Sequence, residues 1–243
     1  SEWRQTSGGR EMNVYALQTA RAGSVSVPNK NVMMHKNVPL YLHNIRYSLS
    51  CDSIQGVYCS TDCPEILKQA EEEGFTAYSR DPPLCTAEAS HHDVIIDGLR
   101  YIEEDVEAEL DVLVVLLGNS ASAFTGDLTK AIQLLINNPD ADCVESVSQF
   151  NMFNPFRALR IDTHGRIQNF LDEDHIRSVV NINDRCSAGD IYFFNGSFWV
   201  IRRDAVIQKT GAPPFPWRGR TILPLVQDTC MEVDAAWQTK LLP

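Results

Sequence analysis

Short apolar strands alternate with amphipathic helices through the first 136 residues, and this alternation restricts the fold more than any other feature. The run Asp111–Leu117 is apolar at every position after its first, so a strand there must be covered on both faces. Strands of this kind that alternate with helices form parallel sheets. The sequence therefore predicts an α/β protein with a mostly parallel central sheet flanked by helices. Strands are expected at residues 14–19, 57–60, 75–78 and 111–117, and helices at residues 40–49, at 62–72 with Asp62 as its cap, after Ser90, and from Thr125 or Asp127 to Ile136.

The second half of the chain has a different pattern. Short strands are expected at residues 143–147, 158–161, 190–194 and 198–201, with irregular connections. The pair Asn195-Gly196 between the last two is typical of a tight hairpin turn. Residues 148–200 are therefore predicted to supply a small antiparallel lid, acceptor-pocket or dimerisation element. Residues 1–12 are expected to be a disordered lead-in, and residues 13–243 a single domain.

The loop at residues 20–31 follows the first buried strand and carries the groups that a phosphate requires. Gly23 lacks a Cβ and can adopt a positive φ, so backbone N–H groups can approach a phosphate closely. Arg21 and Lys30 place positive charge at the two ends of the loop, and Ser24 adds a hydroxyl. The motifs G-x-x-x-x-G-K-[ST] and G-x-G-x-x-G are absent from the chain. The loop is interpreted as a phosphate cradle of another kind, with an ordinary surface connection as the alternative.

Composition disfavours several classes of function. The formal net charge of −11 argues against non-specific nucleic-acid binding, and an anionic substrate would require a locally basic or metal-bridged site. No apolar stretch approaches the roughly 18–20 residues that span a bilayer. The seven cysteines form no Cys-x-x-Cys pair, which disfavours a zinc site or a disulfide framework. We therefore expect a cytoplasmic protein that binds neither nucleic acid nor membrane.

The pattern R-x-G-S-x-x-x-P-x-K-N at residues 21–31 resembles the signature loop of the CMP-sialic acid synthetases, or acylneuraminate cytidylyltransferases. The resemblance continues in S-T-D at residues 60–62, in Arg80 with Thr86, and in M-E-V-D at residues 231–234. These enzymes join CTP to a nine-carbon 2-keto acid sugar and release pyrophosphate. The resemblance thus implies a Rossmann-like nucleotidyltransferase that uses Mg²⁺ and acts as a homodimer, with strands of the second half reaching over the partner's site.

The resemblance also implies roles for individual residues. Glu232 and Asp234 are expected to hold Mg²⁺, and their alternation in a strand-like segment directs both carboxylates to one face. Two solvated acids on a strand edge are the alternative. The expected catalytic residues are Arg21, Lys30 and Asp234. The nucleotide-binding residues are expected to be Ala20, Arg21, Gly23, Ser24, Lys30, Asn31, Arg80 and Thr86, and the acceptor-binding residues Asn119, Ser120, Arg157, Arg185 and Asn195.

Two departures from the family pattern concern phosphate and acceptor binding. Val25 stands where the family usually has a lysine after Gly-Ser, which removes one expected phosphate contact. The segment Gly118–Ala123 replaces a family segment whose glutamine helps to recognise the sugar acid. The resemblance implies a nine-carbon keto acid sugar as the acceptor, and the altered segment leaves an eight-carbon keto acid sugar or a phosphonate as alternatives. A non-catalytic nucleotide-binding protein is the second alternative.

Other conspicuous residues are interpreted as structural. Adjacent His91 and His92 face different directions on a helix, so they are read as polar residues at its start rather than as a metal pair. The aromatic residues of the segment 192–199 are interpreted as core rather than as a base-stacking platform. No Ser/His/Asp order or reactive-cysteine setting indicates covalent catalysis.

Overall fold

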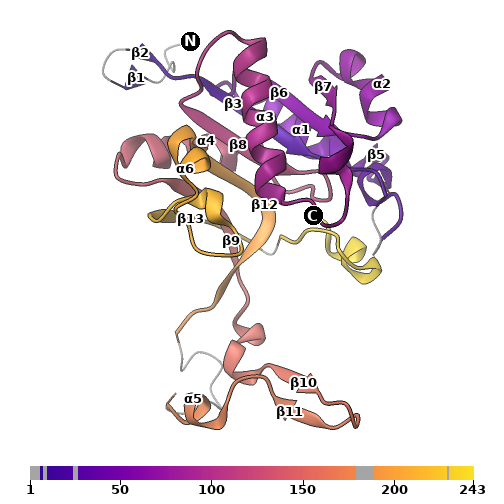
Figure 1. Ribbon diagram of the computed structural model, residues 1–243, viewed down its shortest axis with the longest axis vertical. Coiled ribbons are helices and arrows are strands. Elements are labelled where there is room, and N and C mark those ends of the chain that lie inside the picture. Colours follow the sequence, from indigo (N-terminus) through magenta and orange to yellow (C-terminus); the bar gives the residue numbers. More distant parts are fainter. Residues whose placement is uncertain (1–5, 8–9, 24–26, 179–188, 229) are drawn as a thin grey trace.

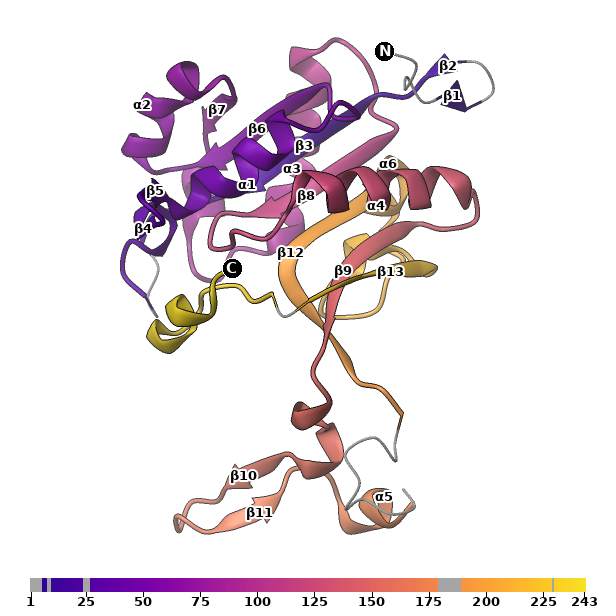
Figure 2. The same cartoon turned by 180° about the vertical axis from the view of Figure 1, so that it is seen from behind.

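A seven-stranded sheet forms the body of the molecule, and helices cover both of its faces (Figures 1 and 2). The computed structural model describes residues 6–7, 10–23, 27–178, 189–228 and 230–243. The strand order is β13-β9-β12-β8-β3-β6-β7, and within this sheet β12 alone runs against the other strands. The mostly parallel α/β fold predicted from the sequence is confirmed. The strands of the sheet are β3 (Val14–Thr19), β6 (Gly56–Thr61), β7 (Thr76–Ser79), β8 (Val112–Leu117), β9 (Cys143–Gln149), β12 (Tyr192–Arg202) and β13 (Ile222–Gln227).

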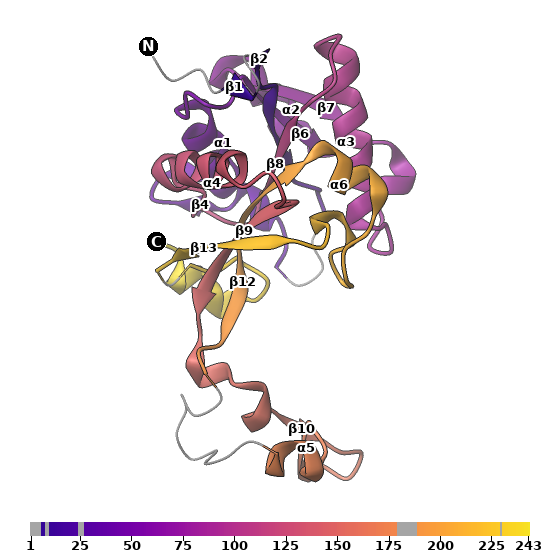
Figure 3. The ribbon, with the colours of Figure 1, turned by 90° about the vertical axis from the view of Figure 1, so that its left-hand side faces the viewer.

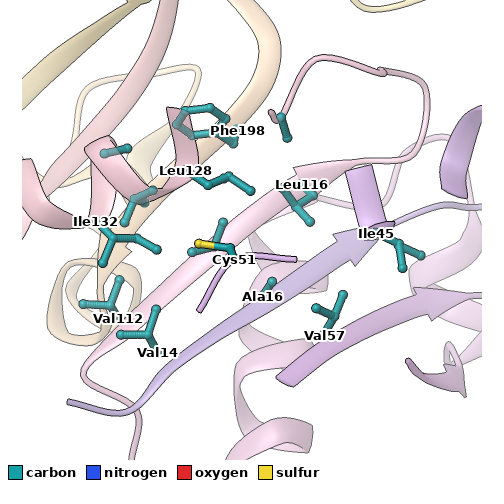
Figure 4. Close-up of a cluster of buried hydrophobic side chains, with 14 of the residues drawn as sticks. Val14, Ala16, Ile45, Cys51, Val57, Val112, Leu116, Leu128, Ile132 and Phe198 are labelled. Carbon is teal, nitrogen blue, oxygen red and sulfur yellow. The ribbon is translucent and has the colours of Figure 1, made fainter. Parts of the chain in front are cut away.

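Each face of the sheet packs against its own set of helices. Side chains of α1, α2 and α4 belong to one buried cluster, part of which is drawn in Figure 4, and side chains of α3 and α6 belong to a second. Strand β8 alternates between them, since Val114 and Leu116 join the first cluster and Leu113 and Val115 the second. This alternation explains why β8 is apolar throughout. The helices are α1 (Leu40–Leu49), α2 (Pro64–Glu73), α3 (His91–Asp105), α4 (Thr125–Asn137), α5 (Glu173–Arg177) and α6 (Arg203–Gln208).

A long excursion between β9 and β12 leaves the body as a projecting arm (Figures 1 and 3). The arm carries α5 and the antiparallel pair β10 (Leu159–Ile161) and β11 (Ile167–Asn169), so the strand predicted at residues 158–161 is confirmed. Because β9 runs in the same direction as β3 and β8, the arm leaves the sheet where the parallel strands have their carboxyl ends.

Strand β12 is continuous, so the predicted hairpin at Asn195-Gly196 is wrong. Its ladder with β9 shifts register between Phe194 and Trp199, which marks a β-bulge rather than a chain reversal. Gly196 has a φ of +76°, and the buried Asn195 side chain hydrogen-bonds to β9 and β13. An Asn-Gly pair supplies positive φ to a bulge as readily as to a turn. The strands predicted at residues 190–194 and 198–201 therefore belong to the main sheet and not to a lid.

The remaining elements are short. In the segment expected to be a disordered lead-in, β1 (Thr6–Ser7) pairs with β2 (Arg10–Glu11), and further along the chain β4 (Met34–His35) pairs with β5 (Val38–Pro39). Short 3₁₀ helices occur at Lys30–Val32, Pro82–Cys85, Asn151–Phe153, Pro155–Arg157, Pro216–Arg218 and Ala236–Leu241. Among the described residues, no helix combines the length and the apolar character that crossing a bilayer requires.

Candidate active site

A cavity of about 340 Å³ lies at the carboxyl ends of β3 and β8, where open α/β sheets bind their ligands. Thr19 and Leu117, the last residues of these two strands, form part of its wall. The cavity gathers residues from the loop after β3, the loop after β7, the start of α3 and the C-terminal segment. Eight of the predicted site residues line it: Arg21, Lys30, Asn31, Arg80, Thr86, Asn119, Glu232 and Asp234.

The loop after β3 is held at several points. Gly23 is exposed with a φ of +70°, the conformation expected for a loop glycine that brings backbone close to a ligand. The Ala22 N–H donates to Asp62 Oδ1 at 2.6 Å, so Asp62 holds this loop in place. The prediction that Asp62 caps α2 is wrong, because the cap residue is Cys63. Asn31 donates to the Arg21 carbonyl at 2.8 Å, and Ala20, the first residue of the loop, is buried. Ser24 and Val25 lie outside the described residues.

Arg80 supplies a buried positive charge to the cavity. Its side chain is 5% exposed, and it donates from Nε to Ser60 Oγ at 3.0 Å and from Nη2 to the Ser60 carbonyl at 2.8 Å. Burial lowers the pKa of the guanidinium, which nevertheless stays charged because its ordinary pKa is so high. In the described part of the chain no carboxylate forms an ion pair with Arg80. A buried cation without an anionic partner favours an anionic ligand.

Two carboxylates from the C-terminal segment meet the loop after β3. Asp234 Oδ1 lies 2.6 Å from Lys30 Nζ, although the two residues are 204 positions apart in the sequence. Asn119 Nδ2 lies 3.3 Å from both Glu232 Oε2 and Asp234 Oδ1. Burial raises the pKa of Glu232, and the charge of Asp234 raises it further, whereas the hydrogen bond from Asn119 and the charge of Lys30 act in the opposite direction. Glu232 and Asp234 thus place two negative charges, one of them partly buried, beside the basic loop after β3.

The bulge in β12 makes room for Glu232. A Cβ at Gly196 would lie 2.4 Å from the Glu232 Cβ and 2.9 Å from its Cγ, far inside van der Waals contact. The glycine is therefore required both by its positive φ and by the close approach of the glutamate.

A second cavity of about 240 Å³ adjoins the first. Phe194, Glu232 and Asp234 line both cavities, so the two spaces meet at the carboxylate pair. The rest of the second cavity is strongly aromatic, with Phe150, Phe153 and Phe193 among its walls. Two ligands bound side by side would therefore share the carboxylates.

Comparison with known proteins identifies the family. A family model described as cytidylyltransferase matches residues 16–184. The chain belongs to this family. The N-acylneuraminate cytidylyltransferase A of Danio rerio is 26% identical over 205 residues, which are 82% of this chain and 44% of that protein. The CMP-N,N'-diacetyllegionaminic acid synthase of Legionella pneumophila is 26% identical over 200 residues, 81% of each chain.

Solved structures show the same fold. The CMP:2-keto-3-deoxy-manno-octonic acid synthetase complexed with CTP superposes with a TM-score of 0.65 at 16% identity, over 94% of this chain and 96% of that chain. A 4-diphosphocytidyl-2C-methyl-D-erythritol synthase also superposes with a TM-score of 0.65, at 11% identity, over 96% and 97% of the two chains. The present chain spans less than half of the length of several curated relatives that it matches.

Most of the residues expected to bind an acceptor do not line the two cavities, or line them with side chains that are already hydrogen-bonded. Ser120 is fully buried, shares a hydrogen bond with Ser122 and lines neither cavity. Arg157 belongs to the arm and does not line either cavity. Asn195 lines the second cavity, but its amide already bonds within the sheet. Arg185 lies outside the described residues.

Sequence reasoning missed His91, which lines the first cavity. Its Nε2 lies 3.1 Å from Thr19 Oγ1, and burial, followed by the charges of Arg80 and His92, lowers its pKa to about 4. His92 is 3% exposed and donates to the Val206 carbonyl at 2.8 Å. The two histidines begin α3, as predicted, but their side chains serve the cavity wall and the core rather than a solvent-facing first turn. They precede Ile95 by four and three positions, so the buried stripe of α3 could have been extended to them.

The aromatic segment is only partly core. Trp199 is 1% exposed, and its ring stacks on Phe194 with centroids 4.0 Å apart. Its Nε1 donates to Glu145, which is ion-paired with Arg218 at 2.8 Å. Phe194 and Trp199 line the first cavity, whereas Tyr192 and Phe193 are 46% and 40% exposed. The predicted core role holds for Trp199 and Phe198 but not for Tyr192 and Phe193.

Proposed function

We propose that the chain transfers CMP from CTP to the hydroxyl of an acidic keto sugar in an Mg²⁺-dependent reaction that releases pyrophosphate. The observation that carries this proposal is the 2.6 Å contact between Lys30 and Asp234 in a cavity that also holds Arg21 and Arg80. It joins a basic phosphate loop to a carboxylate pair, which are the two parts that phosphate chemistry on a triphosphate requires.

The proposed reaction makes modest chemical demands on the protein. The acceptor oxygen forms a bond to the α-phosphorus, the bond to the pyrophosphate oxygen breaks, and the hydroxyl proton leaves to solvent. Positioning and charge neutralisation do most of the catalysis in such transfers. Arg21, Lys30 and the buried Arg80 would neutralise the triphosphate, and the apolar side of the cavity, which includes Leu84 and Val94, would receive the base.

The carboxylate pair fits Mg²⁺. This ion takes one or two carboxylates and completes its shell with water and phosphate oxygens. Glu232 and Asp234 supply two carboxylates, and the described residues contain no group of three His, Cys, Asp or Glu side chains that would indicate an all-protein metal cage. When bound, the ion would neutralise phosphate charge and lower the pKa of the attacking hydroxyl.

The second cavity is proposed to receive the acceptor. It meets the nucleotide cavity at Glu232 and Asp234, so an acceptor there would face the nucleotide across the metal site. Its phenylalanine walls favour apolar substituents such as acylamido groups, which supports an acylated nine-carbon keto acid over an eight-carbon one. Relatives with names of both the acylneuraminate and the legionaminate kind are consistent with this choice.

A homodimer is proposed from the arm. Met152, Leu159, Ile161, Ile167 and Phe170 are each 58% to 75% exposed. Apolar side chains gathered on one projecting element mark an interaction surface, and a second copy of the chain is the proposed occupant. Light scattering of the purified protein should give the mass of a dimer, and the double variant Ile161→Asp with Ile167→Asp should give that of a monomer. A monomeric wild type would contradict the proposal.

The test of the activity is pyrophosphate release from CTP with a panel of acceptors: N-acetylneuraminate, an eight-carbon keto acid sugar and a phosphonate. We expect turnover with the nine-carbon acid, loss of turnover in Asp234→Ala, and normal turnover in the control Lys68→Ala on the exposed face of α2. Undiminished pyrophosphate release by Asp234→Ala would contradict the metal assignment. Calorimetric binding of CTP without product from any acceptor would favour a non-catalytic nucleotide-binding protein.

A further inference from the structure

Asn119 connects the C-terminal carboxylate segment to the sheet through both its side chain and its backbone. Its Nδ2 lies within hydrogen-bonding distance of Glu232 Oε2 at 3.3 Å, Asp234 Oδ1 at 3.3 Å and the Val233 carbonyl at 3.1 Å. Its own carbonyl accepts from the Val233 N–H at 2.8 Å. We infer that Asn119 is a positioning residue that holds the two carboxylates side by side for a divalent cation. This inference rests on the proposed function.

The two partners in this contact differ in how firmly the fold holds them. Asn119 is 8% exposed and follows β8 directly, and the preceding Gly118 N–H donates to the Thr19 carbonyl at 3.1 Å. A Cβ at Gly118 would lie 2.7 Å from the Ala20 Cβ, so the chain here packs tightly against the loop after β3. Residues 231–234, in contrast, belong to no helix or strand. The fixed element therefore positions the irregular one.

The chemistry of the amide suits this task. Glu232 and Asp234 repel each other, and their proximity contributes to the raised pKa of Glu232. An amide NH₂ offers two donors and no charge, so it can bridge two carboxylates while leaving their negative charge available to a cation. Ligands of a metal ion are commonly oriented by hydrogen bonds of this kind, and removal of such a partner weakens metal affinity about 10–100-fold.

Lys30 also contacts Asp234 Oδ1, but it is a poorer candidate for a lasting support. Its ammonium is a point charge on a flexible stem and would be drawn to the phosphates of a bound nucleotide. The Asn119 side chain is short, uncharged and buried, so the phosphates of a nucleotide would not draw it away from Asp234.

The experiment measures Mn²⁺ affinity rather than turnover. Mn²⁺ is titrated by electron paramagnetic resonance into wild type and into the variants Asn119→Ala and Asn119→Leu, with saturating CTP and no acceptor. Both variants should bind Mn²⁺ about 10–100-fold more weakly than wild type, and to the same degree as each other, because neither side chain can donate. Binding of CTP in the presence of EDTA should be unchanged. The control Asn138→Leu, an exposed residue at the end of α4 whose amide bonds to Leu134, should behave as wild type.

The outcomes separate a positioning role from a space-filling one. Normal Mn²⁺ affinity in Asn119→Leu overturns the inference, whether or not Asn119→Ala is impaired, since leucine fills the volume of asparagine without its donors. If the leucine variant does not fold, the variant Asn119→Ser provides the test. The serine hydroxyl restores one hydrogen-bond donor, so this variant should bind Mn²⁺ more tightly than Asn119→Ala. Equal Mn²⁺ affinities of the two variants overturn the inference. A wild type that shows no CTP-dependent Mn²⁺ binding would instead count against the proposed function itself.

Discussion

The close approach of Gly196 to Glu232 gives the sharpest mutational prediction. In Gly196→Ala the new methyl group would lie 2.4 Å from the Glu232 Cβ, and the φ of +76° would be strained for alanine. Both atoms of the 2.4 Å contact sit on or next to backbone, so rotation of the glutamate side chain alone cannot relieve it. The glutamate segment must shift, and with it the carboxylate that Asn119 holds.

The magnitude follows from two separate costs. An alanine in the left-handed region costs about 1–2 kcal/mol relative to glycine. Overpacking by one methyl group adds about 1–3 kcal/mol, so the free energy of unfolding should fall by about 2–5 kcal/mol in total. Gly74→Ala is the matched control, because Gly74 has a φ of +80° at the end of α2 and a Cβ there would meet nothing within 4 Å. It carries the backbone cost alone.

Urea unfolding followed by tryptophan fluorescence measures the two variants against wild type. Gly196→Ala should be less stable than Gly74→Ala by about 1–3 kcal/mol. It should also lose CTP-dependent Mn²⁺ affinity, whereas Gly74→Ala should keep it. The conclusion that the bulge makes room for Glu232 would be refuted if the two variants were equally stable and Gly196→Ala kept the Mn²⁺ affinity of wild type.

Three further predictions concern Lys30 and His91, which line the first cavity, and the ion pair that contacts the cavity residue Trp199. Lys30→Met should raise the KM for CTP and lower kcat in the pyrophosphate assay, and unchanged kinetics would remove Lys30 from the site. Glu145→Gln removes one partner of a largely buried ion pair with Arg218 and should lower the free energy of unfolding by about 3 kcal/mol; a loss below about 1 kcal/mol in urea would contradict this role. His91 has a pKa of about 4 in the folded protein, below its value of about 6.5 in the unfolded chain. Between pH 6.5 and pH 4 the unfolded chain therefore binds a proton on this imidazole that the folded protein does not bind, so the free energy of unfolding decreases as the pH falls. Between pH 7 and pH 5 wild type should lose about 2 kcal/mol more than His91→Gln, and parallel losses in urea would contradict the buried neutral imidazole.

The sequence by itself determined the layers of the fold and the conformation of the glycine in the loop after the first strand. Periodicity is a local property, so the continuously apolar run at residues 112–117 was sufficient to require cover on both faces of its strand. The glycine in the loop after the first strand is also a local signal, because it indicates a positive φ, and Gly23 has a φ of +70°. The extent of the helix at residues 40–49 follows from the same kind of short-range pattern.

Only the tertiary structure decided which distant residues meet. Lys30 and Asp234 are brought together by the packing of separate segments, which no local pattern encodes. The Asn195-Gly196 pair satisfied the rule for a turn, yet the insertion of β12 between β8 and β9 turned the same positive φ into a bulge that accommodates Glu232. The sequence predicted that Asn119 binds the acceptor. Its contacts to Glu232 and Asp234 depend on the packing of the C-terminal segment against the end of β8, which the sequence does not reveal. Local chemistry selects which groups are available, and long-range packing determines what each of them faces.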